Sequence, residues 1–214
     1  MTDASGGFWD RYLFRELALF GAVPAERAAI VFDMWLEDGL FTALALAWWA
    51  SAGDTVAIER ARNIFESRAG SDTSRANRGW NEWGAQTAEF YLALARRDTA
   101  LALELGEMFP EYDCPVACYL RRLSRAQLLA ASGQVAEAAE ILEGGATDFT
   151  NFQAPGDVLW RLERARFHDR LGNADRAITD YSFVANVWRH ADDLLQPFVT
   201  ESREALVRLT GESN

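Results

Sequence analysis

An internal repeat constrains the fold of this chain more than any other feature of the sequence. Residues 122–126, Arg-Leu-Ser-Arg-Ala, recur at 161–165 as Arg-Leu-Glu-Arg-Ala, with a period of 39 residues. Each copy then keeps a Gly seven residues after its Ala, an Ala five residues later and a large residue four residues after that. Agreement at so many positions without a gap predicts two copies of one supersecondary unit. The matched residues are Gly133, Ala138 and Leu142 in the first copy and Gly172, Ala177 and Tyr181 in the second.

The spacing of these residues predicts a pair of antiparallel helices. A small residue in the middle of a helix, such as Ala126, lets a second helix approach closely. Gly133 suits the end of the first helix, where a left-handed backbone conformation is common. Ala138 would then lie at the crossing point on the returning helix, and Leu142 would fill the space one turn later. Such a hairpin cannot bury its apolar face alone, so copies of it must stack.

At these residues the chain resembles the tetratricopeptide repeat family, which has the same small residue, turn Gly, returning Ala and large residue at this spacing. Residues 160–188 give the best match, and the resemblance covers about residues 119–210. The chain departs from the family pattern at His168, where Tyr is usual, and at Val184, where Ala is usual. Its period also exceeds the family's repeat of about 34 residues. The resemblance implies a right-handed superhelix whose first helices line a concave groove for a protein or peptide.

The rest of the chain follows the same helical pattern less regularly. Apolar residues recur at three- and four-residue spacings, and runs of β-branched residues are few. We expect one all-α domain over residues 1–214, an α-solenoid of about five helix hairpins. Residues 1–110 would form degenerate hairpins, 115–190 the two clear repeats and 194–209 a capping helix with a polar outer face. The expected helices span 7–20, 25–37, 39–51, 55–68, 80–96, 99–109, 115–132, 135–144, 156–171, 174–190 and 194–209.

Glycine-rich or polar breaks separate these expected helices. Gly53 and Asp54 suit the end of one helix and the N-cap of the next. The stretch 70–78 is rich in Ser, Gly and charged residues, and we predict a long loop there. A second long loop is predicted at 144–155.

Composition excludes several classes of function. All 21 basic residues are arginine, so a Schiff-base lysine and a phosphate-binding P-loop lysine are both absent. The 32 acidic residues bring the net charge to −11, which disfavours nucleic acid. The common catalytic motifs are missing. We therefore expect a non-enzymatic protein without cofactor or metal.

The sequence offers no targeting or membrane signal. The first ten residues lack the basic and apolar regions of a signal peptide. The longest apolar run, 40–50, is too short to span a bilayer, which takes about 20 residues. We expect a cytoplasmic protein that does not associate with membranes.

The histidines and cysteines give weak signals for chemistry. His168 occupies a repeat position that normally packs inside the hairpin, so we expect a structural role. We expect His190 in the last turn of a helix, where a partly charged imidazole suits the helix dipole. Cys114 and Cys118 are interpreted as ordinary reduced thiols.

An arginine cluster is the best functional signal in the sequence. Six arginines fall on the expected first helices of the two repeats: Arg122, Arg125, Arg161, Arg164, Arg166 and Arg170. Arginines in such a groove could bind an acidic peptide through bidentate hydrogen bonds. The alternative is that they pair on the surface with Glu137, Glu163 and Asp169. By position in the family's repeat, the groove residues would be Leu123, Gln127, Leu162, Arg166, Asp169 and Arg170.

Three other functional hypotheses stay open. Trp48, Trp49, Trp80 and Trp83 either pack in the core or line a small-ligand pocket, as in a sensory module of a bacterial signalling protein. The C-terminal stretch also resembles the tails of large bacterial regulators, so the chain could be a piece of a kinase, cyclase or transcription regulator. The third hypothesis is self-association through the apolar N-terminal end, because no polar cap covers Phe8, Trp9, Tyr12, Leu13 and Phe14.

Overall fold

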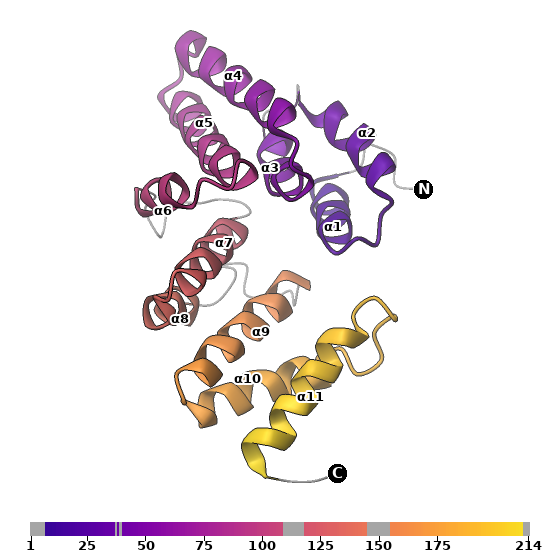
Figure 1. Ribbon diagram of the computed structural model, residues 1–214. Helices are drawn as coiled ribbons and strands as arrows, with labels where there is room; N and C mark the ends of the chain where they lie inside the picture. The colour runs from indigo at the N-terminus through magenta and orange to yellow at the C-terminus, as the bar shows by residue number, and fades with distance from the viewer. Residues whose placement is uncertain (1–6, 37, 39, 109–117, 145–154, 212–214) are drawn as a thin grey trace. The chain divides into compact units, whose positions relative to one another are not determined.

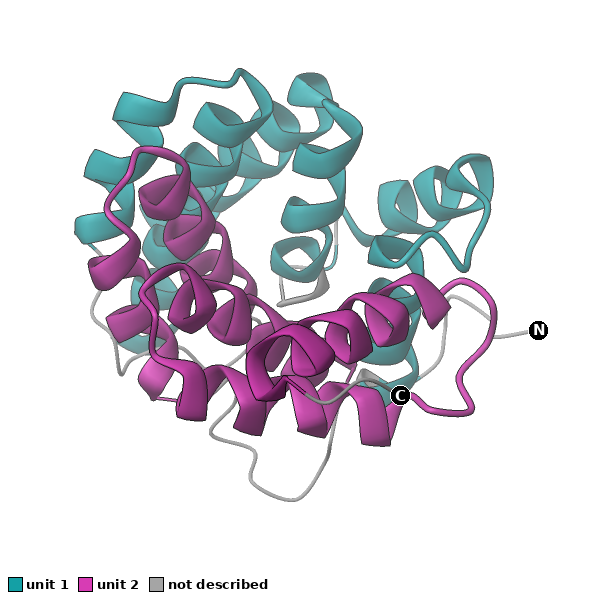
Figure 2. Ribbon diagram, turned by 60° about the horizontal axis from the view of Figure 1, so that its bottom comes forward, with its two compact units in different colours: residues 1–117 teal, residues 118–214 magenta. Residues whose placement is uncertain are grey.

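The chain is all-α, as the sequence predicts (Figure 1). The computed structural model describes residues 7–36, 38, 40–108, 118–144 and 155–211, and these residues contain no strand. The contacts between residues divide the chain into two compact units, unit 1 (residues 1–117) and unit 2 (residues 118–214), which Figure 2 draws in different colours.

Unit 1 is built around its third and fifth helices. Helix α3 packs against α1, α2, α4 and α5, while α5 also packs against α4 and α6. Contacts therefore join helices that are next to one another or two apart in the chain. The helices in the described part of unit 1 are α1 (Phe8–Leu19), α2 (Ala25–Trp35), α3 (Leu40–Ala52), α4 (Thr55–Ser71), α5 (Arg75–Ala95) and α6 (Thr99–Glu107).

Unit 2 contains the two copies of the sequence repeat. The first copy forms α7 and α8, and the second forms α9 and α10. Helix α9 packs against α7, α8 and α10, and α11 packs against α10. Over the residues described in unit 2, the helices are α7 (Cys118–Ala131), α8 (Val135–Glu143), α9 (Pro155–Arg170), α10 (Ala174–Val187) and α11 (Gln196–Thr210).

The same turn joins the two helices of each repeat. Gly133 and Gly172 have φ angles of 91° and 74°, in the left-handed region that glycine adopts without strain. The N–H of the residue after each glycine donates back across the end of the helix. Gln134 bonds to the Leu129 carbonyl at 2.8 Å and Asn173 to the His168 carbonyl at 2.9 Å. The repeated glycine thus ends the first helix, as predicted.

This turn also occurs in unit 1, where the sequence repeat has decayed. Gly53 ends α3 with a φ of 71°, and Arg97 follows α5 with a φ of 60°. The next residues, Asp54 and Asp98, each make the same backbone bond at 2.9 Å. Their carboxylates also cap the following helices, accepting from the N–H of Ala57 at 3.0 Å and of Leu101 at 3.1 Å. Each aspartate therefore ends one helix and starts the next.

The matched small residues lie where the helices of unit 2 cross. Ala126, Ala138, Ala165 and Ala177 are all fully buried, as the repeat predicts. Leu142 and Tyr181, one turn after the returning alanines, are also buried. A second close approach joins α7 to α9, because a Cβ atom at Gly156 would collide with the ring of Tyr119.

The core of unit 1 is aromatic. Phe32 of α2 lies at its centre, with its ring centroid 4.9 Å from that of Trp35 and 5.0 Å from that of Trp48. Phe14 of α1 and Trp49 of α3 complete the cluster through edge contacts with Phe32. These rings bury a large apolar area between α1, α2 and α3.

Two local predictions are wrong. The stretch 70–78 is not a long loop, because α4 continues to Ser71 and α5 already begins at Arg75. Only residues 72–74 connect the two helices, and within this turn the Asp72 carboxylate accepts a hydrogen bond from the N–H of Ser74 at 3.3 Å.

The prediction for His190 is the second wrong one. Helix α10 ends at Val187, so His190 lies beyond the helix and not in its last turn. The other predicted long loop, at 144–155, lies almost wholly outside the described residues.

Helix α11 differs in detail from the predicted capping helix. It buries Val199, Ser202 and Ala205, spaced three residues apart. Leu194, the first residue of the predicted helix, precedes the observed helix and is exposed. The exposed positions of α11 are polar except for Pro197: Thr200, Arg203, Glu204, Arg208 and Thr210.

Candidate partner-binding surface

The first arginine of each repeat motif stacks on an aromatic ring. The guanidinium carbon of Arg122 lies 4.9 Å from the centroid of Trp160, and that of Arg161 lies 4.1 Å from the centroid of Phe183. Stacking of this kind combines cation–π attraction with burial of the arginine stem. These two arginines therefore hold neighbouring helices of unit 2 together.

The second arginine of each motif pairs with a carboxylate on the returning helix. Arg125 of α7 lies 3.6 Å from Glu137 of α8. Arg164 of α9 makes a two-pronged contact with Asp180 of α10, with bonds of 2.7 and 2.8 Å. Asp180 is buried, so the bidentate arginine supplies the charge and hydrogen bonds that a buried carboxylate needs. The hydrogen bonds to Asp180 raise the pKa of Arg164 above its ordinary value.

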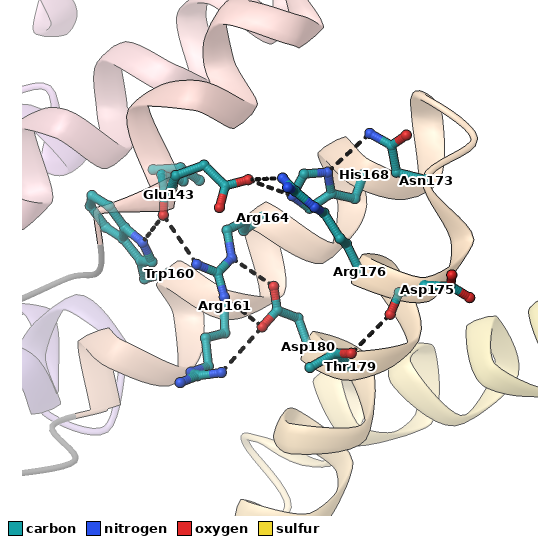
Figure 3. A network of polar contacts seen from close by, with 11 residues as sticks. Glu143, Trp160, Arg161, Arg164, His168, Asn173, Asp175, Arg176, Thr179 and Asp180 are labelled. Atoms are coloured by element: carbon teal, nitrogen blue, oxygen red, sulfur yellow. Dashed lines mark hydrogen bonds and ion pairs between the residues drawn. The ribbon is translucent and has the colours of Figure 1, made fainter.

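The same network closes the C-terminal end of α8 (Figure 3). The Leu142 carbonyl lacks a partner within its own helix and accepts a 2.8 Å bond from the indole N–H of Trp160. The next residue, Glu143, accepts from Arg176 at 2.6 Å and lies 3.1 Å from Nε2 of His168. His168 is buried at this joint, as its repeat position predicts.

A strip of polar side chains crosses α7, α9 and α11, and we call it the polar strip. It begins at Gln127 of α7, whose amide donates to Glu163 of α9 at 2.9 Å. Glu163 also accepts from Arg166 at 2.8 Å. Arg166 then reaches both carboxylate oxygens of Glu201 on α11. The strip consists of Gln127, Glu163, Arg166, Asp169, Arg170, Glu201 and Arg208.

At the other end of the polar strip, an arginine paired with a carboxylate again joins α9 to α11. Asp169 of α9 accepts two hydrogen bonds from Arg208 of α11. The nearby Tyr181 hydroxyl of α10 also helps to lower the pKa of Asp169. Arg170 differs from its neighbours because it donates to the backbone carbonyl of Ala130 at 3.0 Å. Among the described residues it pairs with no carboxylate.

These contacts shift the pKa values of the groups involved. The hydrogen bonds to Glu201 raise the pKa of Arg166, and those from Arg208 lower the pKa of Asp169. Burial, reinforced by the negative charge of Asp169, raises the pKa of Tyr181 to about 12. Arg166, Asp169 and Arg208 are therefore charged at neutral pH, and the Tyr181 hydroxyl is neutral.

The structure brings together four of the six residues that the resemblance places on the groove. Gln127, Arg166, Asp169 and Arg170 all belong to the polar strip. Leu123 and Leu162 are buried, so they support the packing of unit 2 and offer no surface to a peptide. The pairing of Arg125 with Glu137 and of Arg166 with Glu163 matches the alternative interpretation of the arginine cluster.

Sequence reasoning missed several residues of these networks, and Asp180, Glu201 and Arg208 are the acids and the arginine among them that pair with α9. The sequence did hold a signal for Arg208, because it lies 39 residues after its partner Asp169, and 39 residues is the repeat period. Residues one period apart lie at equivalent places on successive first helices. Asp180 carried no such signal, since the first copy has Ile141 at the matched position.

The tryptophans form two separate groups. Trp48 and Trp49 are buried in the core of unit 1. Trp80 and Trp83 of α5 are half-buried and stack on each other with ring centroids 4.7 Å apart. Trp48 and Trp49 therefore pack in the core, which is the first of the two interpretations given for the tryptophans.

The remaining candidate residues assemble no further site in the described part of the chain. Cys114 and the side chain of Cys118 lie outside the described residues. Among those described, no three His, Cys, Asp or Glu side chains are grouped as a metal ion would need. None of the described helices is both long and apolar enough to cross a membrane.

Comparison with family models, curated proteins and solved structures finds no match to this chain.

Proposed function

We propose that the chain is a tetratricopeptide-like α-solenoid that acts as a non-enzymatic interaction scaffold. Its partner would be a protein or peptide with acidic groups, bound on the polar strip. The packing of each unit supports this, because successive helices contact their neighbours one and two places along the chain. Stacked hairpins have this contact pattern.

The observation that carries the proposal is the exposed edge formed by Gln127 and Arg170. Both side chains are exposed, and they come from α7 and α9, the first helices of the two repeats. Arg170 has no carboxylate partner among the described residues, so its charge is available to an acidic group. A guanidinium binds a carboxylate through two parallel hydrogen bonds.

Arg166 would take part only by exchanging partners. Its guanidinium already contacts Glu163 and Glu201, so an incoming carboxylate must replace one of them. Such an exchange yields little net free energy, and an extended peptide also loses conformational freedom on binding. We therefore expect affinities in the micromolar range, about 1–100 µM.

Selection from a phage-displayed library of random peptides tests the proposal directly. We expect enrichment of peptides rich in Asp and Glu, whose binding is lost when Arg170→Glu reverses the charge. Arg203→Glu is the matched control, because Arg203 is exposed on α11 and makes no ion pair within the described residues. Enriched peptides that bind all three proteins equally would refute the assignment to the polar strip.

A further inference from the structure

Arg166 of α9 lies between two carboxylates that are held to different degrees. Glu163, on the same helix, accepts hydrogen bonds from both Gln127 and Arg166, and its side chain is only 15% exposed. Glu201 of α11 is 38% exposed, and within the described residues its carboxylate hydrogen-bonds to Arg166 alone. A carboxylate that arrives from solvent would therefore replace Glu201 and leave Glu163 in place.

Glu201 can leave Arg166 without disturbing the fold of α11. Helix α11 packs closely against α10, and α9 is not among its close neighbours in the described chain. The ion pairs between α9 and α11 join Arg166 to Glu201 and Asp169 to Arg208. All four side chains are partly exposed, and ion pairs at this degree of exposure contribute little to stability.

The charge of the polar strip is balanced within the chain, although its proposed partner is acidic. The strip holds as many carboxylates as arginines: Glu163, Asp169 and Glu201 against Arg166, Arg170 and Arg208. Of these carboxylates, α11 supplies only that of Glu201, and without it the strip would carry a net positive charge. Glu201 thus takes the place on Arg166 that a carboxylate of the partner would take.

We propose that Glu201 is an internal competitor for the acidic partner of the polar strip. In the free protein its carboxylate occupies the guanidinium of Arg166, and a bound partner displaces it into solvent. A competitor in the same chain is present at a high effective concentration, so it lowers the affinity for acidic partners. Only a partner whose contacts extend beyond Arg166 gains enough to displace it. This inference rests on the proposed function, because it concerns the same surface.

The alternative is that Glu201 serves only to hold α11 against α9. In that case, loss of Glu201 and loss of Arg208 would change partner binding in the same direction, because both losses loosen α11. Internal competition predicts opposite directions. Removing the charge of Glu201 frees a guanidinium for the partner, whereas removing that of Arg208 frees the Asp169 carboxylate, which repels an acidic partner.

Binding of a fluorescein-labelled hexaglutamate peptide, followed by fluorescence anisotropy at low salt, tests the inference. We expect Glu201→Gln to lower the dissociation constant about two- to fivefold, the range that an exposed ion pair contributes, and Arg208→Gln to raise it. Glu204→Gln is the matched control, because Glu204 is exposed on α11 and makes no ion pair within the described residues. It changes the charge of the chain as Glu201→Gln does, and it should bind like the wild type.

A double-mutant cycle shows whether Glu201 acts through Arg166. In an Arg166→Gln background the peptide can still reach Arg170, but no guanidinium remains at position 166 for Glu201 to occupy. Glu201→Gln should therefore leave the dissociation constant unchanged in that background. The same two- to fivefold gain there would indicate general charge repulsion and overturn the inference.

The outcomes separate this inference from the proposed function. If the wild type binds hexaglutamate and Arg170→Glu does not, but Glu201→Gln binds no more tightly than the wild type, the inference fails and the proposed function stands. If neither the wild type nor Glu201→Gln binds the peptide, both fail. If Glu201→Gln and Arg208→Gln change the affinity in the same direction, Glu201 acts by holding α11 and the inference is overturned.

Discussion

Arg97 in unit 1 occupies the turn position that Gly133 holds in unit 2. Both residues have a positive φ, of 60° and 91°, and both are followed by a residue whose N–H bonds back across the end of the helix. Arginine rarely adopts this conformation, because its Cβ crowds the backbone carbonyl. The turn is therefore kept at this position although the residue that favours it is absent.

Replacing Arg97 by Gly should stabilise the protein. The change removes the strain of the left-handed conformation, worth about 1–2 kcal/mol, against the larger entropy of glycine in the unfolded chain. We expect a net gain of about 0.5–1 kcal/mol in the free energy of unfolding, measured by urea denaturation. The reciprocal change, Gly133→Ala, should lower it by about 1 kcal/mol. A loss of stability in Arg97→Gly would contradict this account of the turn.

This turn shows how far the sequence predicts the fold. The repeat is readable where Gly133 and Gly172 mark the turns, and the helices there are predicted to within a few residues. Upstream, the predicted helices 80–96 and 99–109 already place a break at residues 97–98. The kind of turn was not predicted, since a propensity rule does not place arginine at a left-handed position. The expected loop at 70–78 failed for a related reason, because the residues after Ser74 are polar but still compatible with helix.

The candidate site was predicted less completely, because its contacts join residues far apart in the chain. The repeat identifies Arg164 and Arg166 as related to Arg125 and Gln127. It does not reveal that Arg164 faces Asp180 and that Arg166 faces Glu201, since neither acid has a counterpart in the first copy. Burial of Leu123 and Leu162 likewise depends on tertiary packing.

Replacing Asp180 by Asn should destabilise unit 2 strongly. The change removes the buried charge and leaves Arg164 with at most one of its two hydrogen bonds to this side chain. We expect the free energy of unfolding to fall by about 3 kcal/mol. Glu59→Gln is the control, because Glu59 pairs with Arg96 on the surface of unit 1 and should matter by less than about 1 kcal/mol. Similar losses from both changes would contradict the structural role of Asp180.

Replacing Trp160 by Phe should also destabilise unit 2. The Leu142 carbonyl would lose its 2.8 Å bond, and Arg122 would stack on a smaller ring. We expect a loss of about 2 kcal/mol in chemical denaturation, from the missing hydrogen bond and the cavity left by the indole. If stability were unchanged, Trp160 would not be closing the end of α8.

The pKa of Tyr181 predicts a difference between wild type and Tyr181→Phe at high pH. Because the pKa is raised from 10.0 to about 12 in the folded protein, folding disfavours the ionised hydroxyl. The contribution of Tyr181 to stability is therefore fully present below about pH 10 and is lost as the pH rises towards 12. Urea denaturation across this range should show wild type losing stability relative to Tyr181→Phe. Parallel pH profiles would contradict the prediction.

Acid should weaken the pairing of Asp169 with Arg208 in the polar strip. The pKa of Asp169 is lowered from its ordinary 3.8 by Arg208, so its contribution is present above this pH and is lost as the pH falls through the lower, folded-state pKa. Asp169→Asn should abolish this part of the acid dependence. If Asp169→Asn lost stability in acid as steeply as the wild type, the pair between Asp169 and Arg208 would not contribute to the stability of the fold.

Quantitative capture from a lysate of the source organism shows whether the polar strip recognises a partner. Wild type, an Arg166→Glu/Arg170→Glu double variant and Arg203→Glu would serve as baits, each first shown by circular dichroism to be folded. The account predicts a partner that is retained by wild type and by Arg203→Glu, lost by the double variant and displaced by an acidic peptide. A partner held equally by all three baits would contradict recognition through the polar strip.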